Sequence, residues 1–413
     1  MEKQVKIPIL CFVTVCCIVM FYSNTNILTT HYDDAYITYR YAINLANGDG
    51  LTFNPGERTD AATSFLFTGL LAALYKIGFH DMEIMSLIVL LLSHIIISII
   101  MYNIIYIITN NKPTSFILAL TTSIHGTLSG WSVMGMETAF FAMMVILFIY
   151  ALFYLENQTA YTILAMLLCL TRPEGILALA VLLVMDKRGE FVASLIVVSV
   201  FYGLKYQYYG TLIPHSVQIK LLTAHGFSLR YVCSFYPVFV IMATCFMVKV
   251  FKPFEWLIII VYLSVGTFWS VILARDVVQI QATVEKSCLE VGWYINNNIP
   301  TDKLILSSEI GGVAYVAINH KFIDGYGLTS SDVLNKYKSG KNIDSILDVR
   351  KPDYIADTYH EINGELHNKN MQTLYFLKEP IQVNSYFNGK DLDLIIRKRS
   401  GRNINYVLYK IGG

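Results

Sequence analysis

Two adjacent carboxylates, Asp33 and Asp34, follow the first long apolar stretch of the sequence. Either one can cap a helix that begins near Ala35, because a carboxylate accepts hydrogen bonds from the free amide groups of a first helical turn and is favoured there by the helix dipole. A carboxylate beside a membrane surface can also take a proton from an alcohol as a general base. The local sequence therefore allows two interpretations. Either one aspartate caps the helix while the other is solvated, or the two act as a catalytic pair.

The residues after this pair predict a short amphipathic helix. Ile37, Tyr41 and Leu45 fall on one face, since helical positions four apart lie above one another. Arg40 belongs to a polar row on another face, and Gly48 is a typical helix stop signal. A short amphipathic helix beside an apolar stretch is expected to lie along the membrane surface, where it would hold the carboxylates at the aqueous boundary.

The composition predicts a membrane protein. The chain has 413 residues, of which 55% are hydrophobic, and its mean hydropathy is +0.50. Several apolar stretches approach the ~20 residues that a helix needs to cross a bilayer. The formal net charge of +1 gives no sign of nucleic-acid binding. Almost all the cysteines fall in apolar stretches, so neither a disulfide framework nor a cysteine metal site is implied.

Counting apolar stretches predicts a mainly α fold, a polytopic bundle of about nine transmembrane helices within residues 1–274. Lys3 and Lys6 precede the first stretch and place the N-terminus inside, so the loop 24–62 would lie outside. An odd number of spans would place the C-terminal region on that same outer side. The stretches cover 7–23, 63–79, 82–108, 114–130, 136–155, 158–185, 191–209, 229–250 and 254–274.

Residues 275–413 differ in composition and predict a small soluble α/β domain. Helical periodicity covers about 276–298. Short apolar runs indicate buried strands, and alternating residues near the C-terminus indicate a closing strand pair. The expected strands lie near 304–306, 322–324, 354–356, 392–396 and 406–409.

A charged motif, Thr171-Arg172-Pro173-Glu174-Gly175, interrupts the apolar stretch 158–185. Proline removes a helical amide donor, so the stretch is expected to break there. Charges at membrane depth usually face a cavity and have a partner. Arg172 and Glu174 could therefore pair with each other between two short helices. Alternatively, Arg172 could bind a phosphate through its planar fork while Glu174 orients it.

Two further segments carry polar residues. Glu137, in Gly135-Met136-Glu137-Thr138, lies on the inner side of the membrane in the nine-span topology. It is interpreted there as a charge at the start of a helix. It becomes a site candidate if the stretch 114–130 is re-entrant. His215 and Lys220 follow Tyr208-Tyr209-Gly210 at the outer end of a span. Lys220 is either a phosphate contact or an interfacial lysine whose ammonium reaches water.

These motifs together resemble a family of enzymes. Asp33-Asp34-Ala35-Tyr36-Ile37, Arg40-Tyr41-Ala42 and Phe53-Asn54-Pro55-Gly56-Glu57-Arg58 resemble the first external loop of polytopic GT-C glycosyltransferases, closest to the cell-wall arabinofuranosyltransferase branch. The Arg-Pro-Glu-Gly motif and the Tyr-Tyr-Gly loop resemble the same family, although His215 stands where asparagine is expected. The likeness covers 1–225 and 285–328; between these ranges the family has more spans.

The resemblance implies an extracytoplasmic enzyme of the bacterial cytoplasmic (inner) membrane. It would transfer a sugar from a polyprenyl-phosphate carrier to an envelope glycan, lipid or protein. Asp33 would be the general base, while Asp34 would orient the acceptor or help hold a divalent cation. Arg172 and Lys220 would neutralise the leaving phosphate. The other expected substrate contacts are Arg40, Glu57, Glu174 and His215.

Two other functions remain open from the sequence. The interrupted helix at Pro173 and the intramembrane charges are also typical of a transporter or flippase of lipid-linked sugars. A catalytically inactive relative that serves as a structural partner in an envelope complex would retain the same motifs. Carrier translocation without sugar transfer would indicate the first, and a folded protein without labelled product would indicate the second.

Overall fold

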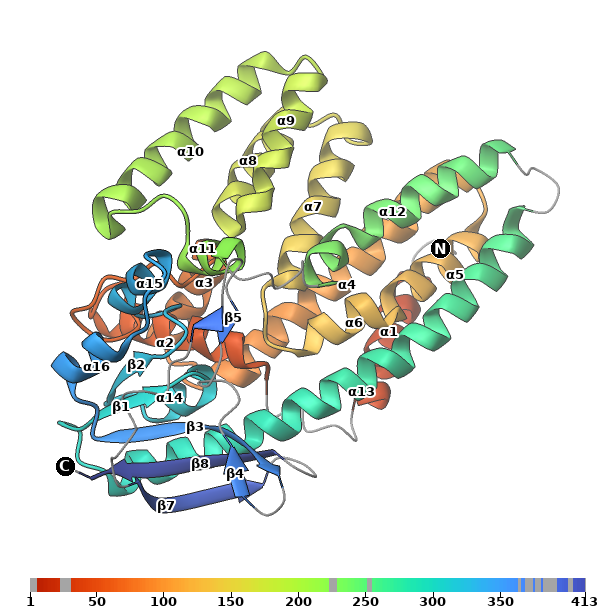
Figure 1. The fold of residues 1–413 in the computed structure, drawn as a ribbon. Coiled ribbons are helices and arrows are strands. Elements are labelled where there is room, and N and C mark those ends of the chain that lie inside the picture. Colours follow the sequence, from red (N-terminus) through yellow and green to blue (C-terminus); the bar gives the residue numbers. More distant parts are fainter. Residues whose placement is uncertain are drawn as a thin grey trace.

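The computed structural model describes residues 6–22, 31–222, 229–250, 255–362, 365–367, 374–375, 380–381, 392–399 and 404–412. The chain forms an elongated helical part and a smaller α/β unit at one end (Figure 1). One long helix, α13 (Glu255–Asn298), runs through both parts and packs against the sheet with its C-terminal half. The boundary expected at residue 275 therefore falls inside a continuous helix.

The expected nine-span bundle is wrong. Among the described residues, two helices are long and apolar enough to cross a membrane, α4 (Met82–Thr109) and α10 (Arg188–Tyr209). The other apolar stretches form shorter or interrupted helices. For example, α3 (Phe65–Lys76) has 12 residues, which gives a length of only about 18 Å against the ~30 Å of a bilayer core. Apolar composition alone did not distinguish such packed helices from spans.

Two of the predicted spans are broken by their own sequences. The stretch 114–130 divides at His125 into α5 (Lys112–Ile124) and α6 (Gly126–Val133). The stretch 158–185 divides at Arg172, whose backbone is extended, and a short 3-10 turn at Pro173–Gly175 follows. A β-carbon on Gly175 would lie 2.1 Å from the Leu168 carbonyl oxygen, so this turn needs glycine. The predicted break at Pro173 is confirmed.

The predicted short helix after the carboxylates is confirmed, but its surroundings differ from the expectation. Helix α2 (Asp33–Asn47) ends at Gly48, which has a left-handed backbone with φ 93°. Its N-cap is Tyr32, so Asp33 and Asp34 lie in the first turn instead of capping it. Every residue from 35 to 44 is buried. The helix is therefore packed inside the protein, because α3 and the α/β unit cover the faces expected to meet membrane and water.

The α/β unit contains a mixed sheet with the strand order β2-β1-β3-β8-β7. Strands β2, β1 and β3 are parallel, β8 runs antiparallel to β3, and β7 is antiparallel to β8. All five strands predicted from the sequence are confirmed. Their bounds are β1 (Leu304–Ser307), β2 (Lys321–Asp324), β3 (Tyr354–Ile362), β7 (Leu392–Arg399) and β8 (Ile404–Ile411). The additional short strands are β4 (Glu365–His367), β5 (Leu374–Tyr375) and β6 (Pro380–Ile381).

Helices cover both faces of this sheet. On one face, α13 and α14 (Gly311–Val316) bury apolar side chains against Ile305, Phe322 and Leu408. Ile37 and Tyr41 of α2 join the same core, so the apolar face predicted for α2 packs against the α/β unit. On the other face, α15 (Ser331–Lys338) and α16 (Asp344–Arg350) form a separate core with the sheet.

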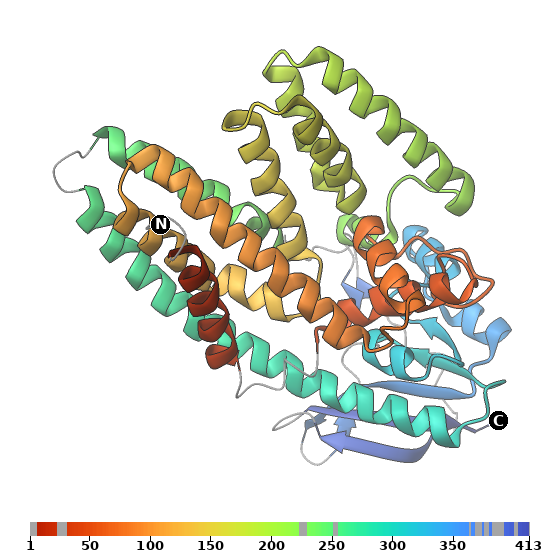
Figure 2. The same ribbon diagram turned by 180° about the vertical axis from the view of Figure 1, so that it is seen from behind.

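The remaining helices form the extended part of the molecule. Helices α7 to α10 project away from the α/β unit, and α1 packs against α4 and α13 (Figures 1 and 2). The chain reversals leave the start of α7 and the end of α8 near α2. The bounds are α1 (Lys6–Tyr22), α7 (Thr138–Phe153), α8 (Gln158–Thr171), α9 (Ile176–Val184), α11 (His215–Leu222) and α12 (Leu229–Val250).

Candidate functional site

Asp33 lies where the helical part meets the α/β unit. Its Oδ1 accepts a hydrogen bond of 3.2 Å from the backbone amide of Gly312, at the start of α14. A β-carbon on Gly311 would lie 2.4 Å from the same Oδ1, and a β-carbon on Gly312 would lie 1.8 Å from Oε1 of Glu285. The two glycines in the first turn of α14, called the glycine turn below, thus allow two carboxylates to approach one stretch of backbone.

Asp33, Glu285 and Glu309 form a carboxylate cluster around this turn. Burial raises the pKa of the Asp33 carboxyl well above its usual range, and the charges of Glu309 and Asp34 raise it further. Burial likewise raises the pKa of Glu285, with added contributions from Asp33 and Glu309. Like charges so close in a low-dielectric site disfavour full ionisation, so the cluster retains protons that isolated carboxyls would lose.

Glu285 was missed by the sequence analysis. Its side chain is buried on the face of α13 that also carries Cys288 and Val291. Its Oε1 makes no hydrogen bond of good geometry to any of the described residues. The sequence contained one signal, a glutamate at helical spacing from apolar residues. A functional role for it could be inferred only from the structure, which places it against the glycine turn.

Aromatic hydroxyls fix the segment that leads into α2. The hydroxyl of Tyr36 donates to Oε1 of Glu83 at 2.5 Å, and the backbone amide of His31 donates to the Tyr36 hydroxyl at 2.9 Å. The Tyr39 hydroxyl is 2.6 Å from Nδ1 of His31. The Tyr32 amide donates to the carbonyl of Met134 at 3.1 Å. The carboxylate segment is thus held against both α4 and the residues before α7.

Arg172 binds two carboxylates. Its guanidinium lies 3.0 Å from Oε1 of Glu137 and 3.2 Å from Oε1 of Glu174. Arg172 and Glu137 are both almost fully buried, while Glu174 retains 27% exposure. The pairing of Arg172 with Glu174, one of the two sequence alternatives, is therefore present. Glu137, read from the sequence as a simple helix-start charge, is the deeper partner.

This ion-paired group lies close to the carboxylate segment. Glu137 lies two residues after Gly135, where an added β-carbon would lie 2.5 Å from Nδ1 of His31. Met136 belongs to the same buried cluster as Tyr36 of α2. The structure therefore brings the motifs around residues 33, 137 and 172 to one region, at the ends of α7 and α8 that face α2.

Arg40 and Glu57, expected as substrate contacts, are engaged in structural interactions. The Arg40 guanidinium is fully buried and donates to the backbone carbonyls of Phe53, Ala314 and His320. It thereby satisfies free carbonyls at the end of α14. Glu57 accepts from Arg350 of α16 at 2.7 Å. Both side chains join the loop after α2 to the α/β unit, and their role as substrate contacts stays a prediction.

His215 lies beside a second buried ion pair. Its backbone amide donates to the carbonyl of Asp60 at 2.8 Å, and the Asp60 carboxylate pairs with Lys205 at the same separation. Burial lowers the pKa of His215 to about 4, so the imidazole is neutral near pH 7. Lys205, which was not predicted, belongs to this group. Lys220 lies in α11, but its side chain falls outside the described part of the chain.

An open cleft borders the Asp60 and Lys205 pair. It has a volume of about 740 Å³ and is lined by aromatic rings of α3 and α10, with Arg58 over the ring of Tyr208. Neither Asp33 nor Arg172 lines this cleft. Within the described ranges, no group of three His, Cys, Asp or Glu side chains is placed to hold a metal ion.

Comparison with known proteins adds one match. Residues 275–399 match the model of a family described as a domain of unknown function, DUF8728. No curated protein matches the chain. The matched range covers the C-terminal half of α13 and most of the α/β unit, including Glu285, Glu309 and the glycine turn, but not Asp33 or Arg172.

Proposed function

We propose that this protein is a membrane-attached glycosyltransferase that uses a polyprenyl-phosphate sugar and has Asp33 as its general base. The observation that carries the proposal is the Asp33 carboxylate, fixed by the Gly312 amide within a cluster that raises its pKa. A carboxylate whose pKa is raised towards neutrality is a stronger proton acceptor once ionised than a solvated aspartate. The motif around Asp33, which resembles GT-C glycosyltransferases, supplies the reaction class.

In the proposed reaction, the acceptor hydroxyl oxygen forms a bond to the anomeric carbon of the donor sugar. The bond between that carbon and the phosphate oxygen breaks, and its electron pair leaves with the polyprenyl phosphate. The hydroxyl proton passes to the Asp33 carboxylate. The anomeric carbon gains oxocarbenium character during the transfer, as in glycoside hydrolysis.

Arg172 is the proposed partner of the leaving phosphate. In the structure, its charge is already opposed by Glu137 and Glu174, so a phosphate has to take the place of one carboxylate. Glu174 is the one that can move, because it is partly exposed and lies on a short turn, whereas Glu137 is buried. A guanidinium can then bind phosphate oxygens through two parallel hydrogen bonds while Glu137 keeps it oriented.

Membrane attachment is proposed through α4 and α10, the two described helices with sufficient length and apolar character. The start of α4 lies beside the carboxylate segment, because Glu83 accepts a hydrogen bond from Tyr36, and Lys205 near the end of α10 pairs with Asp60 of the loop after α2. A lipid-linked donor would therefore enter from the bilayer beside the proposed site. In this proposal, the active region and the α/β unit lie on the extracytoplasmic side of the bacterial cytoplasmic membrane.

The test is sugar transfer by membranes that contain the protein. Membranes with wild type or Asp33→Asn are incubated with radiolabelled polyprenyl-phosphate pentoses and hexoses, and labelled product is separated from donor. Loss of a general base is expected to reduce turnover by ~10²–10⁴-fold. Asp302→Asn, at an exposed turn position, is the matched control and should retain wild-type turnover.

The outcomes separate the proposed functions. Wild-type turnover in Asp33→Asn would remove Asp33 from the chemistry. Absence of labelled product from every donor, with normally folded wild-type protein, would contradict the transferase. Movement of the labelled carrier across vesicles without sugar transfer would indicate a flippase instead.

A further inference from the structure

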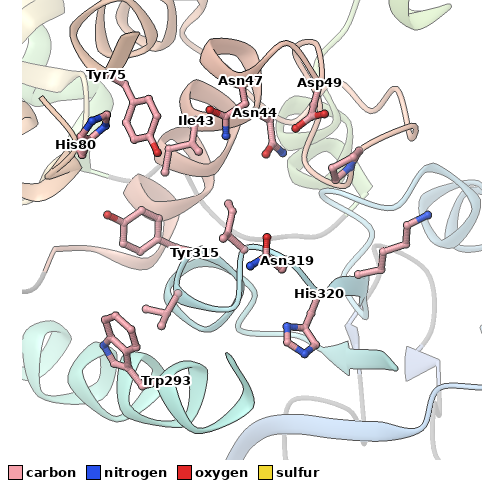
Figure 3. A pocket seen from close by; sticks show the side chains of 14 residues that line it. Ile43, Asn44, Asn47, Asp49, Tyr75, His80, Trp293, Tyr315, Asn319 and His320 are labelled. Atoms are coloured by element: carbon pink, nitrogen blue, oxygen red, sulfur yellow. The ribbon is translucent and has the colours of Figure 1, made fainter. Parts of the chain in front are cut away.

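A second cleft, separate from Asp33, lies between α2, the α3–α4 connection and α14 (Figure 3). Its volume is about 530 Å³, which is within the ~300–1,000 Å³ typical of small-molecule sites. The side chains that matter here come from four separate segments of the chain. They are Asn47, Tyr75, His80, Trp293, Tyr315 and Asn319.

Three aromatic side chains border this cleft. Trp293 of α13 is 58% exposed. Tyr75 is partly buried and meets the His80 ring edge to face, with centroids 4.6 Å apart. Tyr315 is fixed from behind by the ring of Tyr36 at 5.1 Å. Exposed rings on rigid helices offer flat apolar faces, which suit the C–H face of a pyranose or furanose ring.

Neutral polar side chains lie to one side of the aromatic rings (Figure 3). Asn47 and Asn319 are exposed at the rim, and each amide both donates and accepts hydrogen bonds. The charged groups in the lining, Asp49 and Lys321, are opposite in sign. Paired amides suit adjacent sugar hydroxyls, and the balanced charge gives no preference for a phosphate or another anion.

The cleft is connected to Asp33 through α14. The first turn of this helix binds the Asp33 carboxylate, and its C-terminal residues, Tyr315 and Val316, line the cleft. Tyr315 also contacts Tyr36, one turn beyond Asp33 on α2. A chain of sugars seated in the cleft would therefore lie on the same short helix that fixes the proposed base.

We infer that this cleft binds a neutral oligosaccharide through stacking on Trp293 and hydrogen bonds to Asn47 and Asn319. Its role as the acceptor subsite rests on the proposed transferase function, but the binding itself does not. The cleft would then select acceptors by several sugar units at once, at a position away from the reacting hydroxyl.

Binding is measured with purified full-length protein in detergent and no donor present. Neutral arabino-, galacto- and manno-oligosaccharides are titrated by calorimetry, with inorganic phosphate as the anionic probe. At least one neutral oligosaccharide should bind, and phosphate should not compete. Trp293→Ala should weaken binding by ~10-fold or more, and Asn319→Leu should weaken it as well.

Phe268→Ala is the matched control, because Phe268 is an aromatic residue of the same helix with 63% exposure and lies outside the cleft. Its affinity should equal that of wild type. Unchanged affinity in Trp293→Ala, or no binding by any of the neutral oligosaccharides, would overturn the inference even if sugar transfer persists. Conversely, Asp33→Asn should bind the oligosaccharide normally, so failure of the transferase proposal would leave this binding intact.

Discussion

The amide of Gly312 donates a hydrogen bond to the Asp33 carboxylate across 279 positions of the chain. This bond joins the start of the helical part to the first helix of the α/β unit. It also places a carboxylate from the first loop among carboxylates of the C-terminal half, where burial and like charge raise its pKa. The proposed base is thus created where the helical part and the α/β unit meet.

Replacing Gly312 with alanine should disrupt this junction. The added β-carbon would lie 1.8 Å from Oε1 of Glu285, so the glutamate or the turn must move. Overpacking of this kind costs ~1–3 kcal/mol, which thermal unfolding in detergent will detect. Gly69→Ala is the control, because its β-carbon would meet no atom within 4 Å in helix α3. Equal melting temperatures for the two variants would refute the close approach.

Replacing Glu309 with glutamine should move the pH dependence of sugar transfer. The acidic limb of the rate profile reports protonation of Asp33, whose pKa is raised partly by the charges of Glu309 and Asp34. Removing the charge of Glu309 lowers the pKa of Asp33, so activity should persist to lower pH. The measurement is the transfer rate across acidic to neutral pH. An acidic limb that does not move would show that Glu309 does not influence the base.

Replacing Glu285 with glutamine should change how stability depends on pH, because burial raises the pKa of Glu285 in the folded protein. A carboxyl with a raised native pKa is most favourable when protonated, so its contribution is present below the unfolded pKa and is lost as pH rises through the native pKa. Wild type should therefore lose stability as pH rises from about 4 towards neutrality, and Glu285→Gln should lose less. Melting temperatures over this range test the sign. A larger loss in the variant would contradict it.

Removing Glu137 from its pair with Arg172 should lower the free energy of unfolding more than removing Glu174 does. Glu137→Leu leaves a buried guanidinium with only a partly exposed partner, and such losses cost ~3–5 kcal/mol. Glu174→Gln should cost ~1 kcal/mol or less because its carboxylate is partly hydrated. The double variant Arg172→Met with Glu137→Leu should recover part of the loss. Additive effects in denaturant unfolding would argue against a direct buried pair.

Arg40→Lys should destabilise the protein despite retaining the charge. The guanidinium of Arg40 reaches three separate backbone carbonyls, and a single ammonium cannot reproduce that fork. Each unsatisfied buried acceptor costs ~1–3 kcal/mol. Arg58→Lys is the control, because Arg58 lies over the Tyr208 ring in an open cleft. Equal melting temperatures for Arg40→Lys and the control would refute the role of Arg40 in joining the loop after α2 to the α/β unit.

Local patterns in the sequence were sufficient for several elements. Gly48 ended α2 as predicted because its backbone is left-handed, and Pro173 ended α8 because proline lacks an amide donor. Short apolar runs identified the strands of the sheet. The span count failed because the hydrophobicity of a stretch reports burial from water, which a neighbouring helix provides as well as lipid does.

The sequence by itself determined the helix breaks, the strands and the presence of unusual charges in apolar surroundings, since these depend on neighbouring residues. Only the tertiary structure decided which charges meet. It placed Glu285 beside Asp33 and Glu137 beside Arg172, and it directed Arg40 to backbone carbonyls. Such pairings depend on contacts between residues far apart in the chain, and local spacing carries no information about them.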